Sequence, residues 1–416
     1  MTRRSYEDEI RAVGVASGLD AVGIAPATAF AGTERDLVER KEAGLHGGMQ
    51  FTYRRPSRST DPSRALPTAR SLVVGARSYR MEAPSRPTGS GPVARVARYA
   101  WADHYGDLRR ALDQVSERLQ RDGWATRVLV DENALVDREA AVRAGLGWYG
   151  KSSNVLLPGH GSWFVLGSVL TDAELVPAVA PAPDGCGSCR RCLDGCPTGA
   201  IVAPGVVDAR RCLAWLVQAP GSFPRRHRIA LGDRIYGCDD CQEVCPPNRQ
   251  EDRRPVPRPI SGPGRHEAWV PILELLAASD DELLARHGRW YIARRDPVHL
   301  RRTALVGLGH TADPAEPEVV APLRRHLVHP HPCSGPTPSG PPVASVATTS
   351  SPPPTPSPRT AIPRSEQSSM RLTHPCGSPP PSPAPVREAP ARHERLPAQA
   401  RWHPVLPVGA LAAPAA

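Results

Sequence analysis

The 416-residue chain lacks any apolar run approaching the roughly eighteen residues that a membrane-spanning helix needs. It also lacks the apolar stretch of a signal peptide, because the N-terminus turns acidic at Glu7-Asp8-Glu9. Without that stretch the Arg3-Arg4 pair makes a poor twin-arginine export signal. These absences exclude an integral membrane protein and predict a cytoplasmic one.

Proline and cysteine are abundant instead, with 49 prolines and 10 cysteines. Eight of the cysteines lie between Cys186 and Cys245, whereas Cys333 and Cys376 stand alone in proline-rich sequence. In a reducing cytosol, clustered cysteines are more often metal ligands than disulfides. The formal charge of +10 favours a polyanionic partner without identifying it.

The first 176 residues alternate helical and strand patterns. Apolar residues at helical spacing predict a helix over residues 103–121 that ends at Gly123, and a further helical segment covers residues 133–144. Strands are expected at residues 71–75, 126–131 and 163–170. This alternation predicts an α/β or α+β domain, followed by a Pro/Ala linker over residues 177–183.

Beyond residue 255 the pattern becomes helical. Residues 269–276 are apolar, Ser279 to Glu282 form a capping box, and Asp296-Pro297 opens a helix that Gly309 closes. A second helix carries the apolar residues between Val319 and Leu327. The last two helices resemble one unit of an α-solenoid, which needs neighbours to bury its apolar face.

Those neighbours are missing from residues 333–416, which hold 21 prolines in 84 residues. Two interpretations stay open: a disordered tail, and the product of a shifted reading frame in a GC-rich gene. Residues 332–340 can be encoded by codons that, when translated in a frame shifted by two bases, give an amphipathic segment. Resequencing the gene decides between the interpretations, since an intact frame through codon 333 excludes the second.

The strongest motif is a pair of cysteine runs. Cys186, Cys189, Cys192 and Cys196-Pro have the spacing of a [4Fe–4S] ligand run, and Cys212 precedes a second run of Cys238, Cys241 and Cys245-Pro. In such pairs the cysteine before proline reaches the other cluster. One cluster is therefore expected on Cys186, Cys189, Cys192 and Cys245, and the other on Cys196, Cys212, Cys238 and Cys241. Two zinc sites are the disfavoured alternative.

Two adjacent iron–sulfur clusters carry single electrons, and two further sequence features concern the group that accepts these electrons. Gly145-Leu-Gly-Trp-Tyr-Gly150 matches a dinucleotide-binding pattern by letter, but a helical segment precedes it where that fold requires a strand. The glycines leave room for another cofactor. Asp131 ends a predicted strand, and it is either a general acid or the N-cap of the following helix.

Six stretches together resemble the epoxyqueuosine reductase family over residues 1 to about 332. They are Val130-Asp131, Gly145–Lys151, Gly161–Gly167, the first cysteine run through Ile201, Asp208–Cys212 and Ile235–Gln242. The resemblance implies reduction of epoxyqueuosine to queuosine at the wobble position of tRNA. It also implies a cobalamin, two [4Fe–4S] clusters and a helical-repeat domain that helps to hold the tRNA.

The resemblance further assigns residues. It implies that Asp131 is the proton donor, that Arg54, Asp131, Val155 and Leu166 lie against the cobalamin, and that the eight cysteines hold the clusters. Asp103-His104-Tyr105 stands where many relatives have Asp-Tyr-His, so its last two residues are exchanged. The sequence has no D-x-H-x-x-G stretch to supply a histidine to cobalt, which is consistent with a base-off cobalamin.

Clustered basic residues are candidate phosphate contacts for such a tRNA, the alternative being a solvated surface. They are Arg225, Arg226, His227, Arg228, Arg234, Arg294, Arg295, Arg301 and Arg302. The expected partners are tRNA carrying epoxyqueuosine and an unidentified electron donor. No membrane partner is expected, and the protein is expected to be a monomer.

The expected fold is α+β. An N-terminal α/β cobalamin-binding domain (1–176) precedes a ferredoxin-like domain with two [4Fe–4S] clusters (177–255), a HEAT-like helical segment (256–332) and the proline-rich tail (333–416). Two other functions fit the sequence less well. A two-cluster ferredoxin would leave the first 175 residues unused, and a corrinoid reductive dehalogenase resembles an exported enzyme, whereas this chain lacks the export segment.

Overall fold

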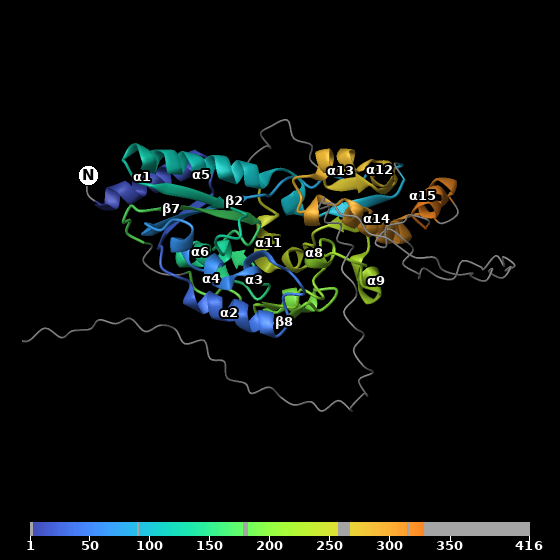
Figure 1. Cartoon of the computed structure of the whole chain (residues 1–416), viewed down its shortest axis with the longest axis horizontal. Coiled ribbons are helices and arrows are strands. Elements are labelled where there is room, and N and C mark those ends of the chain that lie inside the picture. The colour runs from blue at the N-terminus through green and yellow to red at the C-terminus, as the bar shows by residue number, and fades with distance from the viewer. Residues whose placement is uncertain (1–2, 90, 178–181, 257–266, 314–315, 328–416) are drawn as a thin grey trace, which may run out of the picture. The chain divides into compact units, whose positions relative to one another are not determined.

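The computed structural model describes residues 3–89, 91–177, 182–256, 267–313 and 316–327 (Figure 1). All of them belong to the first of two units of the chain, Met1–Ser350. The predicted tail, the middle of the predicted linker, Cys333 and Cys376 lie outside the described residues. Among the helices that are described, none is long and apolar enough to cross a membrane.

The N-terminal part is built on a four-stranded sheet. Its strands are β1 (Ala21–Pro26), β2 (Ser71–Ser78), β7 (Phe164–Thr171) and β4 (Thr126–Val130), in the order β1-β2-β7-β4. All three predicted strands are confirmed. Every neighbouring pair is antiparallel, so the domain is α+β rather than α/β.

Helices cover both faces of this sheet (Figure 1). On one face, α1 (Arg3–Ala16) and α5 (His104–Arg121) pack on the sheet through the predicted apolar stripe of α5. On the other face lies α6 (Asp137–Arg143), which begins four residues later than the expected segment. Gly123, with φ of 88°, follows the end of α5 as predicted.

Short elements complete this part of the chain. They are α2 (Ala31–Glu42), α3 (Phe51–Arg54), α4 (Pro56–Ser59), the 3₁₀ helices η1 (Pro62–Arg64) and η2 (Arg98–Ala100), and the hairpin of β5 (Trp148–Tyr149) and β6 (Val155–Leu156).

The cysteine region has only short elements. They are α7 (Arg191–Asp194), β8 (Ile201–Ala203), β9 (Val206–Val207), α8 (Leu213–Leu216), η3 (Arg225–His227), α9 (Arg228–Leu231), β10 (Arg234–Tyr236), α10 (Asp240–Glu243) and α11 (Pro246–Glu251). Each cysteine run therefore contains a one-turn helix, α7 in the first run and α10 in the second, and α7 packs beside α10.

A second sheet joins the three predicted domains. Its order is β10-β3-β11, where β3 is Val93–Val96 and β11 is Trp269–Pro271. The predicted domains 1–176, 177–255 and 256–332 each contribute one strand to this sheet. A single apolar core packs against the sheet. The three sequence segments therefore share a folded core rather than forming separate bodies.

The C-terminal helices are α12 (Ile272–Ala277), α13 (Asp280–His287), η4 (Ala293–Arg295), α14 (Val298–Thr311) and α15 (Pro317–Leu327). The capping box at Ser279 is confirmed. The apolar segment at 269–276 becomes helical only at Ile272, because its first three residues pair with β3. Asp296 accepts a hydrogen bond from the Val298 N–H, but the N-cap of α14 is Pro297 rather than the expected Asp296, and the helix continues two residues past Gly309.

Arg302 is a structural residue, and its predicted role as a phosphate contact is wrong. Its side chain is 2% exposed and donates hydrogen bonds to the carbonyl oxygens of Leu216, Val217, Ala219 and Gly221. The guanidinium therefore ties α14 to the chain that follows α8.

We expect Arg302→Met to lower the free energy of unfolding by about 3 kcal/mol, because it leaves buried carbonyls without donors. Urea denaturation of the anaerobically purified protein measures the loss. The control is Arg325→Met at an exposed position on α15, which should change stability by less than about 0.5 kcal/mol. Equal stabilities for the two variants would contradict the structural role.

Candidate redox and active site

The eight clustered cysteines form two groups of four in space. Thiol–thiol electrostatic interactions join Cys245 to Cys186, Cys189 and Cys192. The same interactions join Cys241 to Cys196, Cys212 and Cys238. This is the crossed grouping that the sequence predicts. Among the described residues, no three metal-ligating side chains are arranged for a single metal ion.

Local geometry produces the crossing. Pro246 is the first residue of α11, so Cys245 stands at the N-cap of that helix, and α10 in the same run packs beside α7 of the first run. Gly195 allows the close packing, because a Cβ there would lie 2.9 Å from a Val244 methyl group. Burial raises the pKa of the Cys238 thiol to about 12 and that of Cys245 to about 11.

A buried amide network attaches the second cysteine run to the sheet. Asn248 is fully buried and accepts a hydrogen bond from the Ser162 N–H at 2.6 Å. Gln242 donates to the Tyr79 hydroxyl at 2.9 Å and to the Ser162 carbonyl at 3.0 Å. A Cβ on Gly161, where φ is +74°, would lie 2.1 Å from the Asn248 amide oxygen, so only glycine fits.

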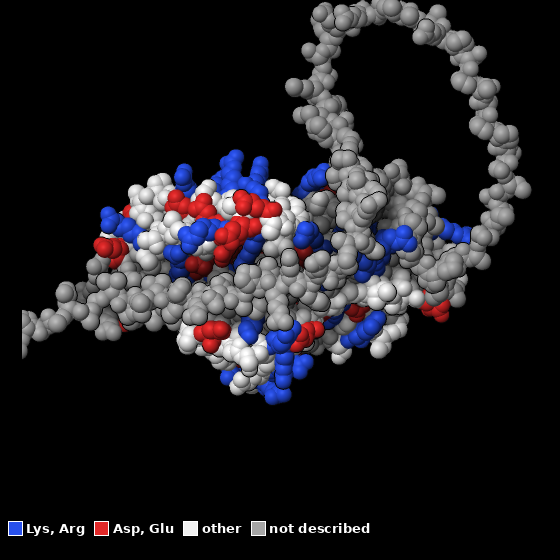
Figure 2. All heavy atoms as spheres, turned by 90° about the horizontal axis from the view of Figure 1, so that it is seen from below, with Lys and Arg blue, Asp and Glu red and all other residues white. Residues whose placement is uncertain are grey.

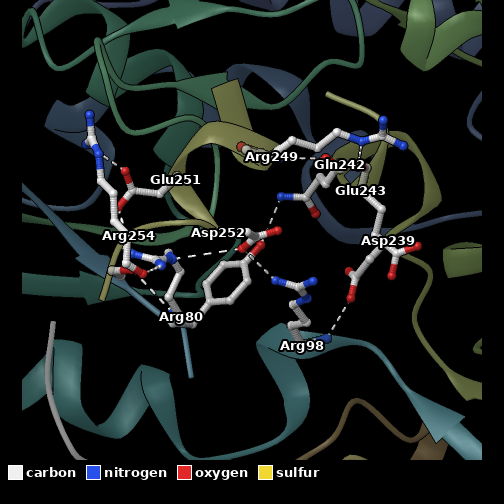
Figure 3. A network of polar contacts seen from close by, with 12 residues as sticks. Arg80, Arg98, Asp239, Gln242, Glu243, Arg249, Glu251, Asp252 and Arg254 are labelled. Carbon is white, nitrogen blue, oxygen red and sulfur yellow. Dashed lines mark hydrogen bonds and ion pairs between the residues drawn. The ribbon is translucent and has the colours of Figure 1, made fainter. Parts of the chain in front are cut away.

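Charged groups extend this attachment (Figure 3). The buried Arg80 pairs with Glu251 at 2.8 Å, and Arg98 pairs with Asp252 at 2.8 Å. The Arg98 N–H donates to the Asp239 carboxylate at 2.6 Å. Because Asp239 lies between Cys238 and Cys241, these contacts fix the cysteine loop relative to the N-terminal sheet.

Asp131 lies at the end of β4 in a left-handed conformation with φ of 52°. Val130 pairs with Gly167, so Asp131 comes next in register to Leu166 of β7. The N-cap interpretation is wrong, because α6 starts at Asp137 and its N-cap is Val136. Partial desolvation of the carboxyl raises the pKa of Asp131, although the residue as a whole is exposed. A strained, partly desolvated carboxyl suits proton donation.

Three residues that the sequence did not single out as candidates interact electrostatically with Asp131. Burial raises the pKa of Asp137 well above its usual range, and the charge of Asp131 adds to this shift. Burial likewise raises the pKa of Tyr105, and that of Tyr236 to about 12, with Asp131 again contributing. The sequence assigned no role to Tyr105, because His104 and Tyr105 stand in the exchanged order relative to many relatives. Tyr236 was noted only as part of the Ile235–Gln242 stretch.

The predicted cobalamin-contacting residues fall in two places. Val155 of β6 is buried and Leu166 of β7 is half-buried, and both pack in the same apolar core. Arg54 ends α3 and is exposed. In the turn before β6, Ser153 has φ of 65°, and its buried hydroxyl lacks a hydrogen-bond partner among the described residues. This orphaned hydroxyl fits a site that a ligand completes.

The predicted basic contacts also separate by environment. Arg234 pairs with Asp240 at 2.6 Å, and Arg301 pairs with Asp280, so both are engaged within the fold. Arg225, Arg226, Arg294 and Arg295 are exposed, whereas Arg228 is half-buried and His227 is buried. Figure 2 shows basic and acidic side chains interspersed on the face it displays, so phosphate contacts must be assigned residue by residue.

Family models match two stretches of the chain. Residues 59–132 match "Epoxyqueuosine reductase QueG, DUF1730", and residues 185–248 match "4Fe-4S double cluster binding domain". The second match covers all eight clustered cysteines.

Curated relatives match over most of the chain. The epoxyqueuosine reductase of Bacillus subtilis (strain 168) is 34% identical over 302 residues, which are 71% of this chain and 77% of the relative. The enzyme of Vibrio cholerae is 33% identical over 79% of this chain and 89% of the relative. That of Escherichia coli (strain K12) is 35% identical over 73% and 80%.

Solved structures agree with these matches. A crystal structure of epoxyqueuosine reductase with an epoxyqueuosine-modified tRNA-Tyr stem loop is similar with a TM-score of 0.72 and 30% identity, covering 80% of this chain and 88% of that one. A structure of the Bacillus subtilis enzyme, described as having its catalytic aspartate loop swung out of the active site, has a TM-score of 0.69 at 30% identity, covering 80% and 88%.

Proposed function

Because this chain belongs to the epoxyqueuosine reductase family, we propose that it reduces epoxyqueuosine to queuosine at the wobble position of tRNA with Asp131 as the proton donor. The observation that carries the proposal is that the fold combines two groups of four thiols with a partly desolvated carboxyl at Asp131, each within a stretch that a family model matches. Such a chain can deliver both single electrons and a proton.

The residues present fit the cofactors of this family. Two sets of four thiols match two [4Fe–4S] clusters: Cys186, Cys189, Cys192 and Cys245, and Cys196, Cys212, Cys238 and Cys241. The apolar Val155 and Leu166, Asp131 and the exposed Arg54 would hold a base-off cobalamin, with the orphaned Ser153 hydroxyl nearby in sequence. When bound, the clusters supply single electrons and the cobalamin supplies the low-potential reducing centre.

The chain itself supplies the proton. Removing the epoxide oxygen as water and leaving an alkene consumes two electrons and two protons. Asp131 gives the first proton to the departing oxygen, since desolvation raises the pKa of its carboxyl and so favours the acid form. Its solvent contact then allows the carboxylate to regain a proton from water.

The remaining layout follows from the same proposal. Residues 1–176 bind the cobalamin, residues 177–255 carry the clusters, and helices α12 to α15 form the HEAT-like segment that helps to hold the tRNA. The exposed Arg225, Arg226, Arg294 and Arg295 contact phosphates. The protein acts in the cytoplasm as a monomer and receives electrons from a separate donor.

The test of the proposal is anaerobic purification with cobalamin supplied, followed by iron analysis and a visible spectrum of the same sample. We expect about eight irons per chain together with a base-off corrinoid spectrum. Eight irons without corrinoid would instead indicate a ferredoxin-type electron carrier and would withdraw Asp131 as the acid.

A further inference from the structure

Three aromatic side chains from distant segments form a row that ends at the surface. The Phe51 ring on α3 meets the Tyr291 ring edge to face at 4.8 Å and the Trp215 ring on α8 at 6.0 Å. Trp215 is buried and Phe51 half-buried, whereas Tyr291 is 45% exposed. We propose that this aromatic row binds a nucleobase directly flanking the epoxyqueuosine of the substrate tRNA, an inference that rests on the proposed function.

The loop that presents Tyr291 is held firmly from beneath. Trp290 stacks between Tyr236 at 4.6 Å and His287 at 4.4 Å. The Tyr291 N–H donates to the Tyr236 hydroxyl at 2.7 Å, and Arg289 donates to the carbonyl oxygens of residues 100–102. An exposed ring on a fixed backbone loses little conformational entropy when a base stacks on it.

The inner end of this row lies beside a proposed cluster ligand. Trp215 is on α8, whose N-cap is Cys212, and Phe51 shares α3 with Arg54, a proposed cobalamin contact. The aromatic row therefore runs from the proposed cofactor site to the exposed Tyr291. A nucleotide adjacent to the modified base would emerge close to Tyr291, and unstacked RNA bases commonly stack on such rings.

Two arginines of the same loop provide charge for the RNA backbone. Arg294 and Arg295 are exposed, and both have left-handed backbones with φ of 56° and 57°. Such conformations are strained for non-glycine residues and occur at ligand-binding sites. Among the described residues Arg294 has no ion-pair partner, so its guanidinium can meet a phosphate. A nucleobase with its phosphate thus fits both features of the loop.

Tyr291→Ala tests the aromatic contact. We expect it to weaken binding of an anticodon stem loop about 10- to 100-fold and to raise KM similarly, since stacking contributes about 1–3 kcal/mol per base. The kcat at saturating RNA and the iron content should stay within about twofold of wild type, and Tyr291→Phe should restore affinity. The matched control is Trp124→Ala, at an aromatic residue 40% exposed beyond the end of α5, which should bind normally.

The stacked base is located with 2-aminopurine placed on the 5′ or the 3′ neighbour of the wobble nucleotide. We expect wild-type protein to quench the fluorescence at one of these positions and Tyr291→Ala to lose that quenching. Arg294→Gly keeps the left-handed backbone while removing the cation, and it should reduce the slope of log affinity against log salt by about one.

Wild-type affinity and wild-type quenching at both positions in Tyr291→Ala would overturn the inference. Its failure is distinguishable from failure of the proposed function. If wild-type protein reduces epoxyqueuosine in the stem loop while the variants bind normally, only the aromatic contact is refuted. If wild-type protein carrying both cofactors does not reduce it, the proposed function itself is refuted.

Discussion

Asp131→Asn is expected to lower turnover by about two to four orders of magnitude while iron and cobalamin contents stay at wild-type values. The amide has nearly the same size as the carboxyl, but it cannot give a proton to the departing oxygen. The matched control is Glu132→Gln, which changes the next carboxylate in the chain. Glu132 pairs with Arg109 at 3.2 Å and with Arg127 at 3.7 Å, so we expect near-normal turnover in that variant.

The pH dependence of kcat separates a proton donor from a residue that only shapes the site. The pKa of Asp131 is raised, so the protonated form is present below the raised value and is lost as pH rises through it. We expect the kcat of the wild type to fall as pH rises through the pKa of Asp131. The residual kcat of Asp131→Asn should lack this fall. Near-normal turnover in Asp131→Asn would refute its assignment as the acid.

Cys245→Ser is expected to remove about half of the iron and to lower turnover more than about 100-fold. Cys245 lies with Cys186, Cys189 and Cys192, so its loss should affect the cluster of that group alone. Cys241→Ser should remove the other cluster instead. Iron analysis and low-temperature EPR of the reduced variants distinguish the two losses.

Cys376→Ser is the control for that experiment, because this cysteine stands alone in proline-rich sequence and belongs to neither run. Its iron content and turnover should match wild type. If Cys245→Ser retained both clusters, or if it lost the EPR signal that Cys241→Ser also loses, the crossed ligation would be wrong.

Much of the fold follows from local sequence patterns. The apolar stripe from Leu108 to Leu119, the capping box at Ser279 and the strand expected at residues 126–131 are set by neighbouring residues. The structure contains all three, with the strand one residue shorter than expected. The pairing of β3 with β10 and β11 joins residues 93–96 to residues 234–236 and 269–271. No local pattern encodes such long-range partners, which is why residues 269–271 were expected to be helical.

The candidate site, like the fold, could be predicted from the sequence only in part. Cysteine spacing predicts the two groups of thiols, because the ligands of each cluster occur in short runs. The environment of Asp131 could not be predicted, since Tyr105, Asp137 and Tyr236 come from three separate elements. Arg302 was wrongly predicted to lie at the surface, because a basic residue on a helix usually does. Its burial depends on hydrogen bonds to carbonyl oxygens more than 80 residues away in the sequence, which no local pattern indicates.

The central claim is tested most directly by a product assay. The chain loaded with both cofactors is incubated anaerobically with a low-potential reductant and a tRNA stem loop carrying epoxyqueuosine, and the released nucleosides are analysed by mass spectrometry. Our account predicts conversion of epoxyqueuosine to queuosine, a product lighter by one oxygen atom, over many turnovers. Unchanged epoxyqueuosine in the presence of chain that holds its full iron and corrinoid would contradict it.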